Sequence, residues 1–211
     1  MRITVKLTLL LILNTGLLLT SCQKEINPLD PATGTGGTGN TNNIIGEYNF
    51  VGLTATTYSS VTVSVPGSEL RAVTVSDYIT KNNVGTATIT ASNIMFTGVG
   101  YSIDTTANAK TYIDGVLFDD SDLPFIAAFP PTNTTSSYTR INSDSLNAIG
   151  AVGAPNPSGV TPTGTVGVKL SWSGDTLLLS IKSSFTQSIS QGGVPGTLTG
   201  YVNGISKLKK R

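Results

Sequence analysis

The residues of this chain that could do chemistry are few, and most of them are carboxylates. The sequence contains no histidine and a single cysteine, Cys22. Without histidine, the Ser-His-Asp and Cys-His nucleophile systems and His-ligated zinc sites are excluded. Paired carboxylates, which glycosidases use, are the remaining option for a catalytic site. The aspartates concerned are Asp77, Asp104, Asp114, Asp119, Asp120 and Asp122.

Residues 119–122, Asp-Asp-Ser-Asp, form the densest acidic patch of the sequence. Oxygen-rich clusters of this kind can hold Ca²⁺, but the twelve-residue EF-hand spacing with its closing glutamate is absent. A solvated turn between strands explains the patch better than a metal site does, and a catalytic pair of aspartates is the least favoured interpretation. We therefore predict no enzymatic activity, no catalytic residues, no metal site and no cofactor.

The single cysteine closes an export signal. Arg2 and Lys6 precede an almost unbroken apolar run over residues 7–19, and residues 19–22 are Leu-Thr-Ser-Cys. A basic start, a short apolar run and small residues are typical of a secretory signal, and the run is too short for a lasting membrane span. An ordinary signal peptide with a cysteine nearby, or an uncleaved anchor, are the alternatives. Because Cys22 is the only cysteine, no intrachain disulfide can form.

Residues 19–22 resemble the lipobox of bacterial lipoproteins, in which an aliphatic and two small residues precede an invariant cysteine. The resemblance implies that residues 1–21 are a signal peptide and that the Cys22 sulfur carries a diacylglyceryl group. Two or more acyl chains, such as palmitate, hold a protein durably on a membrane at about 0.8 kcal/mol per buried CH₂. We therefore expect a lipid anchor at Cys22 in the bacterial outer membrane, on its periplasmic face or at the cell surface.

Composition favours one β-rich domain behind a tether. Charged residues make up 12% of the chain and the formal net charge is +1, so no basic surface for nucleic acid is expected. Residues 22–43 are rich in Gly, Thr and Asn, which predicts a flexible tether after the lipidated cysteine. Residues 44–211 are long enough for one domain with a substantial core. Thr favours strands in this domain, and Gly and Asn favour turns.

Apolar and polar residues alternate along much of residues 44–211, which indicates strands. The clearest alternations are residues 61–65 and residues 166–172, and Gly52 is expected to mark a bulge or bend. The apolar segment 125–129, bounded by prolines, is either an edge strand or a cap on one end of the fold. Turns are expected at residues 66–67, 82–85, 105–108, 114–115 and 173–175, and the longest loop at residues 150–164.

Eight to ten strands in sequential hairpins favour an all-β, antiparallel up-and-down barrel, and a two-sheet β-sandwich is the alternative. The domain resembles the lipocalin-like lipoproteins of Bacteroidetes-type bacteria through its lipobox, its Gly-rich tether, the opening Gly46-Glu47-Tyr48 and the hairpin at residues 173–177. Lipocalins open with Gly-x-Trp and pack a late arginine over that tryptophan. Here Tyr48 takes the tryptophan's place, and Lys207 is the nearest cation late in the chain.

The resemblance implies a lipocalin-like barrel that binds a small apolar or amphipathic ligand. The alternative is a surface interaction or adhesion module, a β-sandwich that binds glycan or another envelope protein through loops such as residues 150–164. Aromatic side chains could line a ligand cavity, but a small barrel can also fill its interior with them, so no ligand-binding residues are assigned. The aromatic candidates are Tyr48, Phe50, Phe96, Tyr101, Tyr112, Phe118, Tyr138, Trp172 and Phe185.

Overall fold

A computed structural model describes residues 43–149 and 164–211, which form nine β-strands, and all the strand pairings are antiparallel. The predicted signal peptide, Cys22, nearly all of the predicted tether and residues 150–163 lie outside the described residues. Among the described residues, no helix is long and apolar enough to cross a membrane. The strands are β1 (Gly46–Val65), β2 (Ser68–Ile79), β3 (Lys81–Ile89), β4 (Asn93–Ile113), β5 (Val116–Arg140), β6 (Ser145–Ile149), β7 (Thr165–Ser173), β8 (Thr176–Gln191) and β9 (Val194–Lys210).

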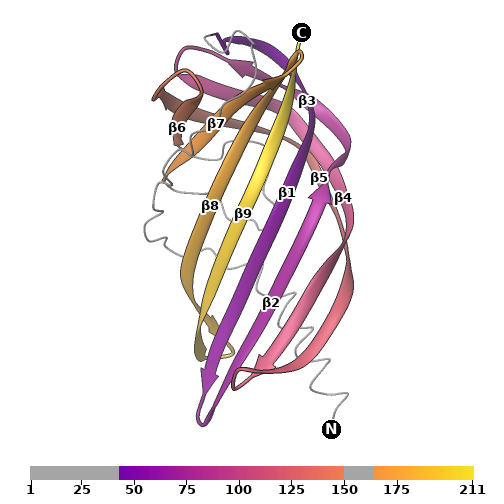
Figure 1. Cartoon of the computed structure of the whole chain (residues 1–211), viewed down its shortest axis with the longest axis vertical. Coiled ribbons are helices and arrows are strands. Elements are labelled where there is room, and N and C mark those ends of the chain that lie inside the picture. The colour runs from indigo at the N-terminus through magenta and orange to yellow at the C-terminus, as the bar shows by residue number, and fades with distance from the viewer. Residues whose placement is uncertain (1–42, 150–163) are drawn as a thin grey trace.

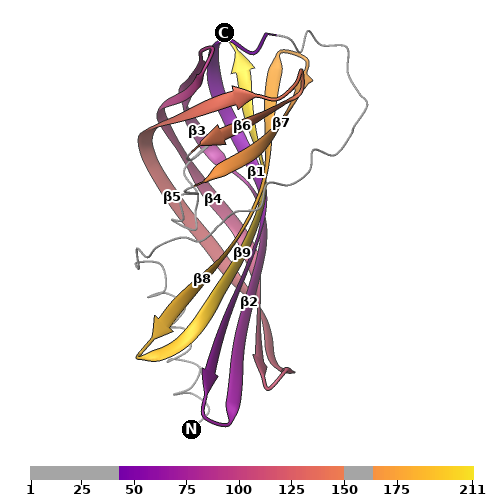
Figure 2. The same ribbon diagram turned by 90° about the vertical axis from the view of Figure 1, so that its left-hand side faces the viewer.

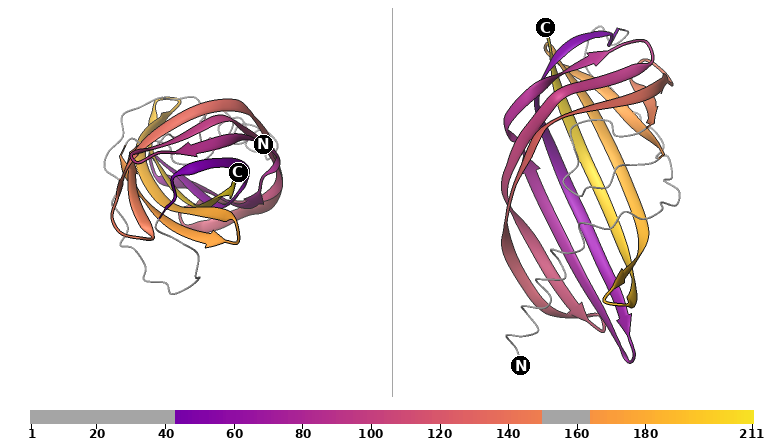
Figure 3. Two further views of the ribbon diagram at one scale, coloured as in Figure 1. Left: turned by 90° about the horizontal axis from the view of Figure 1, so that it is seen from above. Right: turned by 180° about the vertical axis from the view of Figure 1, so that it is seen from behind.

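The sheet closes on itself at one end of the molecule. There, β1 pairs with β3 on one side and with β9 on the other. From β3 the order continues through β4, β5, β6, β7 and β8 to β9, so these strands and β1 form a closed ring (Figure 1; Figure 3, left). The predicted up-and-down barrel is therefore confirmed, its nine strands lie within the expected eight to ten, and the β-sandwich alternative is wrong.

Beyond the ring, six long strands continue as one open sheet (Figure 2). In this part β2 takes the place of β3, pairing with β1 on one side and with β4 on the other. The order is β5-β4-β2-β1-β9-β8. Among the described residues, β7 pairs with β8 only as far as Ile181, and β6 pairs with β5 only from Ser137 onward. β5 and β8 are therefore the two edges of the open sheet.

The change of partner along β1 is held by hydrogen bonds between Leu53 and Thr80. The Thr80 amide donates to the Leu53 carbonyl at 2.9 Å, and the Leu53 amide donates to Thr80 Oγ1 at 2.8 Å. Thr80, which separates β2 from β3, is buried, so these bonds form away from water. The predicted irregularity at Gly52 is confirmed as a register shift between Phe50 and Gly52.

The hydrophobic core fills the ring. On β1, Tyr48 and Phe50 are buried while Glu47 and Asn49, the residues just before them, are exposed, as period-two alternation requires. The Tyr48 hydroxyl donates to the Ile44 carbonyl at 2.6 Å, which satisfies the one polar group of that side chain. Each fully buried large apolar side chain stabilises the fold by about 1.5–3 kcal/mol. The fully buried set includes Tyr48, Phe96, Ile89, Ile94, Leu146, Leu177, Leu179 and Leu208.

Three of the predicted turns are confirmed. Residues 66–67 separate β1 from β2, and Gly174 at φ 60° lies between β7 and β8. Asp114 and Gly115, with φ values of 50° and 78°, join β4 to β5. Positive φ at both central residues is the signature of the two-residue turn that matches strand twist, and Asp-Gly is suited to it.

Two predicted turns are wrong. Residues 82–85 lie within β3 and residues 105–108 lie within β4. In β3, Asn82 at φ 53° and Gly85 at φ 102° shift the register against β4 without reversing the chain. The polar residues of the second segment pair in register with β2 and β5. The segment 125–129 lies in β5 and is part of an edge strand, one of its two predicted roles.

Gly85→Ala is expected to destabilise the fold strongly. A Cβ at this position would lie 2.5 Å from the Gly98 carbonyl oxygen, and its φ of +102° is strained for any side chain. Gly67→Ala is the control, because its φ is +83° but no atom lies within 4 Å of the added Cβ. In urea unfolding we expect losses of about 3 kcal/mol for Gly85→Ala and about 1 kcal/mol for Gly67→Ala. Equal losses would rule out a steric role for Gly85.

Candidate ligand-binding face

The aspartates considered for catalysis do not converge on one site. Asp104 forms an ion pair with Lys81 at 3.0 Å, and Asp114 accepts a hydrogen bond from the Glu69 amide at 2.8 Å. Asp77 accepts one from a threonine hydroxyl. Within the described part of the chain, no group of three or more His, Cys, Asp and Glu side chains could hold a metal ion.

The acidic patch at residues 119–122 was predicted to be a turn. This prediction is wrong, because the patch is a segment of β5. Asp120 and Asp122 accept hydrogen bonds from Asn108 Nδ2 at 2.9 and 3.0 Å, and Lys110 lies 3.0 Å from Asp120. The hydrogen bond from Asn108 lowers the pKa of Asp120 most, and the hydrogen bond from Lys110 lowers it further. These groups form a solvent-exposed polar ladder between β4 and β5. Four polar residues in a row carry no alternating signal, so sequence reasoning took the strand for a turn.

The open sheet has an inner face that continues the interior of the ring. On β1 the side chains that point into the core, Phe50, Leu53 and Ala55, are followed on the same face by residues 57, 59, 61 and 63. Cross-strand register extends this face over the neighbouring strands. The inner face comprises Thr57, Ser59, Val61, Val63, Leu70, Ala72, Thr74, Ser76, Ala107, Ala109, Thr111, Ile113, Asp119, Ser121, Leu123, Phe125, Ala127, Ser183, Phe185, Gln187, Ile189, Gly196, Leu198, Gly200 and Val202.

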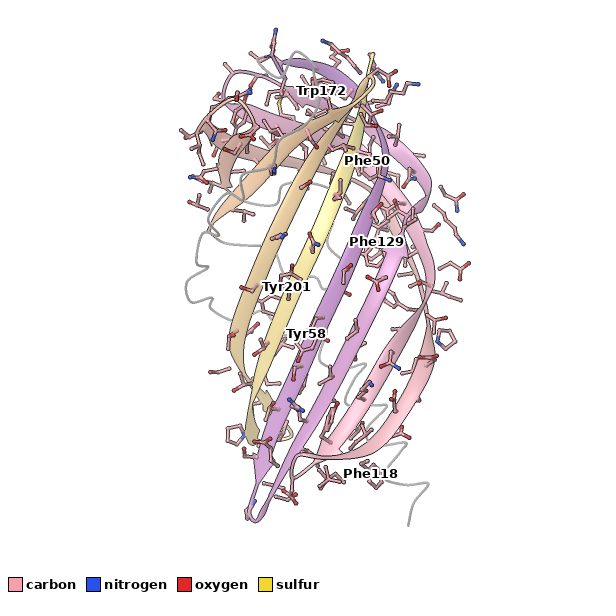
Figure 4. The ribbon with its side chains drawn as sticks, in the orientation of Figure 1. Phe50, Tyr58, Phe118, Phe129, Trp172 and Tyr201 are labelled. Atoms are coloured by element: carbon pink, nitrogen blue, oxygen red, sulfur yellow. The ribbon has the colours of Figure 1, made fainter. Side chains whose placement is uncertain are left out.

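An aromatic cluster lies where the ring passes into the inner face. The Tyr101 ring lies 4.9 Å from the Phe129 ring and 6.3 Å from the Phe50 ring, measured between centroids. The Tyr78 ring meets the Phe125 ring edge-on at 6.4 Å. Figure 4 shows Phe50 and Phe129 near this level of the molecule. Aromatic pairs in such geometries contribute about 0.5–1.5 kcal/mol beyond the area that they bury.

Burial controls the ionisation of the two tyrosines in the aromatic cluster. Loss of hydration raises the pKa of Tyr78 to about 12. Loss of hydration also raises the pKa of Tyr101, and repulsion from Tyr78 in its ionised form raises that pKa further. Both phenols therefore stay neutral at any physiological pH, and the cluster presents an uncharged, largely apolar surface to the inner face.

Polarity changes along the inner face. Next to the aromatic cluster, the hydroxyl groups of Thr57 and Ser76 share a hydrogen bond of 2.7 Å. Ser59 and Thr74 follow as a cross-strand pair, so a band of hydroxyl groups crosses the middle of the face. The far end of the face is richer in apolar residues, although Thr111, Asp119 and Gln187 also lie there. Its apolar residues are Val61, Val63, Leu70, Ile113, Ile189 and Leu198.

Small residues leave the inner face low in side-chain volume. Ala72, Ala107 and Ala109 lie on adjacent strands, and Gly200 lies on β9. A Cβ added to Gly200 would fall 2.2 Å from the Phe185 ring, so this ring lies directly over the Gly200 backbone. Phe185 therefore covers part of β9 from the edge strand β8.

The aromatic residues proposed from sequence have different roles. Tyr48, Phe50, Phe96, Tyr101 and Tyr138 are at most 9% exposed and belong to the core, the simpler of the two interpretations. Tyr112 lies on the outer face under the Arg71 guanidinium, 4.4 Å from its ring centroid, and Phe118 is 58% exposed. Trp172 packs against Tyr48, and Phe185 is the one candidate that lies on the inner face.

Sequence reasoning missed Tyr78, Phe125 and Phe129 of the aromatic cluster. On β5 the inward residues alternate with Pro124, Ile126 and Ala128, which are also nonpolar, so period two is hidden. The two flanking proline sites were a usable signal, because prolines within a sheet mark edge strands.

One cation beside the opening of the first strand is Arg211. Its Nε donates to Asn49 Oδ1 at 2.9 Å, and its guanidinium lies 3.7 Å from the Glu47 carboxylate. Lys207, the cation considered from sequence, instead lies opposite Gly52 on β9. The late cation opposite Tyr48 is therefore Lys210, the last residue of β9, and Arg211 follows it beside Glu47 and Asn49.

No protein-family model matches this chain, and no curated protein matches its sequence. The likeness to lipocalin-like lipoproteins therefore remains a prediction from sequence. The features of the chain that bear on function are the geometry of the inner face and residues 19–22.

Tyr78 is expected to make the fold sensitive to alkali. The unfolded chain releases this phenolic proton near its ordinary pKa of 10, whereas the folded chain holds it to about 12. The stabilising contribution is therefore complete below pH 10 and is lost at about 1.4 kcal/mol per pH unit as the pH rises from 10 to about 12. Urea unfolding of wild type and Tyr78→Phe from neutral to alkaline pH measures this difference, because other alkaline effects are common to both. We expect a shallower decline for Tyr78→Phe; parallel curves would contradict a raised pKa.

Proposed function

We propose that this protein is a lipoprotein, anchored in the bacterial outer membrane by lipid on Cys22, whose barrel binds a small apolar or amphipathic ligand without catalysis. The observation that carries this proposal is the inner face, which extends the interior of the barrel beyond the closed ring. The ring itself is filled by buried side chains such as Tyr48, Phe96 and Leu177. The ligand would therefore lie on the inner face and not within the ring.

The distribution of groups on the inner face favours an amphipathic ligand. Apolar contact at the aromatic cluster and at the far end would contribute roughly 25 cal/mol for each Å² removed from water. The hydroxyl band between them, with Thr57, Ser59 and Thr74, would orient a polar group of the ligand through hydrogen bonds. A few polar groups in an apolar surround are the usual composition of a small-molecule site.

Native mass spectrometry tests ligand binding most simply. The sample is the mature chain, residues 22–211, with Cys22→Ser so that no lipid is attached to the protein itself. We expect an added mass that organic extraction removes and that proves to be an apolar or amphipathic molecule. A bare mass, together with no thermal stabilisation by a panel of fatty acids and isoprenoids, would overturn the proposal.

A matched pair of substitutions locates the ligand. Ala72 lies on the inner face, while Val73, the next residue of β2, lies on the outer face. Ala72→Trp is expected to weaken binding of a fluorescent fatty acid at least about tenfold, since the indole fills space that the ligand needs. Val73→Trp adds the same bulk outside and is expected to leave affinity unchanged. Equal affinities for the two variants would place the ligand elsewhere.

The anchor is tested separately on the full chain. Cells grown with radiolabelled palmitate are expected to label the wild-type protein and to leave Cys22→Ser unlabelled, because the thiol is the attachment point. Wild-type protein is expected in the outer-membrane fraction, and the variant in the soluble envelope fraction. Labelling of Cys22→Ser would contradict this assignment, because it would show that the lipid is attached at another residue.

A further inference from the structure

The two edges of the open sheet differ in their capacity to pair with another strand. Among the described residues, β8 pairs with β9 alone over residues 182–190, and β5 pairs with β4 alone over residues 116–135. An edge strand presents unpaired backbone N–H and C=O groups, which another strand can bind. Proteins usually block such edges with prolines, charges or bulges.

The β5 edge is blocked in this way. Pro124, Pro130 and Pro131 lack an N–H group, and Asp120 and Asp122 are exposed along the same strand. The register against β4 also shifts where β5 approaches the ring, between Val99 and its neighbours on β4. A strand placed along β5 would therefore lose donors and meet carboxylates.

The β8 edge has none of these protections over most of its length. Residues 182–190 are Lys-Ser-Ser-Phe-Thr-Gln-Ser-Ile-Ser, with one charge and no proline. The pairing of β8 with β9 runs from Thr176 to Gln191 without a register shift. The side chains of this segment on the outer face are exposed, and all except Lys182 are small and polar; they are Ser184, Thr186, Ser188 and Ser190. A straight, regular edge of this kind is a ready template for strand addition.

The turn at the end of β8 determines which backbone groups are free. Gly192 and Gly193, at φ 59° and 84°, form a two-residue turn between Gln191 and Val194. The residues flanking such a turn form a hydrogen-bonded pair, and pairs of this type recur at every second residue. Odd-numbered residues of β8 therefore bond to β9. Even-numbered residues from 182 to 190 direct their N–H and C=O groups to the open edge.

We propose that the β8 edge, residues 182–190, pairs antiparallel with β8 of a second copy of this chain, about a twofold axis through Thr186. In this register Ser184 lies opposite Ser188 of the second copy, and Lys182 lies opposite its Ser190. No like charges face each other, and hydroxyl groups of opposing residues are in position to bond across the pair. The free groups of the two edges exchange about ten backbone hydrogen bonds.

A closed dimer fits this edge better than an open chain of copies. Pairing of β8 with β5 of another copy would place Pro124 and the aspartates along the new pair, and repeated head-to-tail contacts would not close. The β8–β8 pair uses one surface on both copies and closes after two. It also joins the two inner faces, because Phe185 then lies opposite Gln187 of the second copy.

The mass of the mature Cys22→Ser chain, measured by light scattering across a concentration series, tests this pairing. We expect a dimer. Thr186→Pro removes one edge-directed N–H without removing a bond to β9, and is expected to give a monomer with unchanged circular dichroism. Thr186→Val keeps the N–H and is expected to remain a dimer, as is Ile126→Pro on the β5 edge. A monomeric parent, a larger assembly, or a Thr186→Pro dimer would overturn the proposal.

Cysteine cross-linking keeps the test decisive if Thr186→Pro does not fold. In the Cys22→Ser background, Thr186→Cys brings two thiols together at the twofold axis and is expected to form a covalent dimer on mild oxidation. Ser184→Cys separates the two thiols by about four residues along the strands, roughly 13 Å, and is expected to stay uncross-linked. Equal cross-linking of both variants, or of neither, would contradict the proposed register.

Discussion

The closed ring and the open sheet both depend on the hydrogen bonds between Leu53 and Thr80, which lie where β1 changes its neighbouring strand. One strand, β1, pairs with β3 before this point and with β2 after it. Thr80 supplies an amide donor and a hydroxyl acceptor to the same residue, so the buried backbone of Leu53 stays satisfied while its neighbour strand changes. A buried amide without an acceptor costs about 1–3 kcal/mol, which explains why a hydroxyl is needed there.

The two parts of the molecule follow from this change of partner. Where β3 lies beside β1, the strands from β3 to β9 and β1 form a closed ring, and the enclosed side chains form a buried core. Where β2 lies there, six strands run on without closing, and the same side-chain parity continues onto an inner face that no described strand covers. Tyr78, Tyr101 and Phe129 lie at the boundary and give this face an apolar floor. Binding is thus proposed on a surface that the core packing positions but does not fill.

Local signals in the sequence predicted the architecture well. Asp114-Gly115 and Pro66-Gly67 carry turn chemistry in two residues, and the alternation at residues 61–65 requires only period two. Features that depend on distant residues were out of reach. The bond between Leu53 and Thr80 joins positions 27 apart, and Asn82 and Gly85 bend a strand in a way that is locally indistinguishable from a turn.

The candidate site was the least predictable part for the same reason. Its aromatic cluster is made of ring pairs that lie 28 to 51 positions apart in the sequence, and nonpolar outward residues hide the alternation of β5. The predicted export signal is the opposite case, since that prediction depends on contiguous residues and needs no fold. The sequence therefore carries a more detailed expectation of where the protein is located than of which residues form the inner face.

The central claim is that ligand binds on the inner face, and photoaffinity labelling tests it most directly. A fatty acid with a diazirine near its chain end would be bound to the mature chain, irradiated, and its attachment sites identified by peptide mass spectrometry. The account predicts saturable labelling of alternate residues such as Val61, Val63, Leu70 and Ala72, competed by unlabelled fatty acid. Labelling of the intervening outward residues, or labelling that does not saturate, would contradict it.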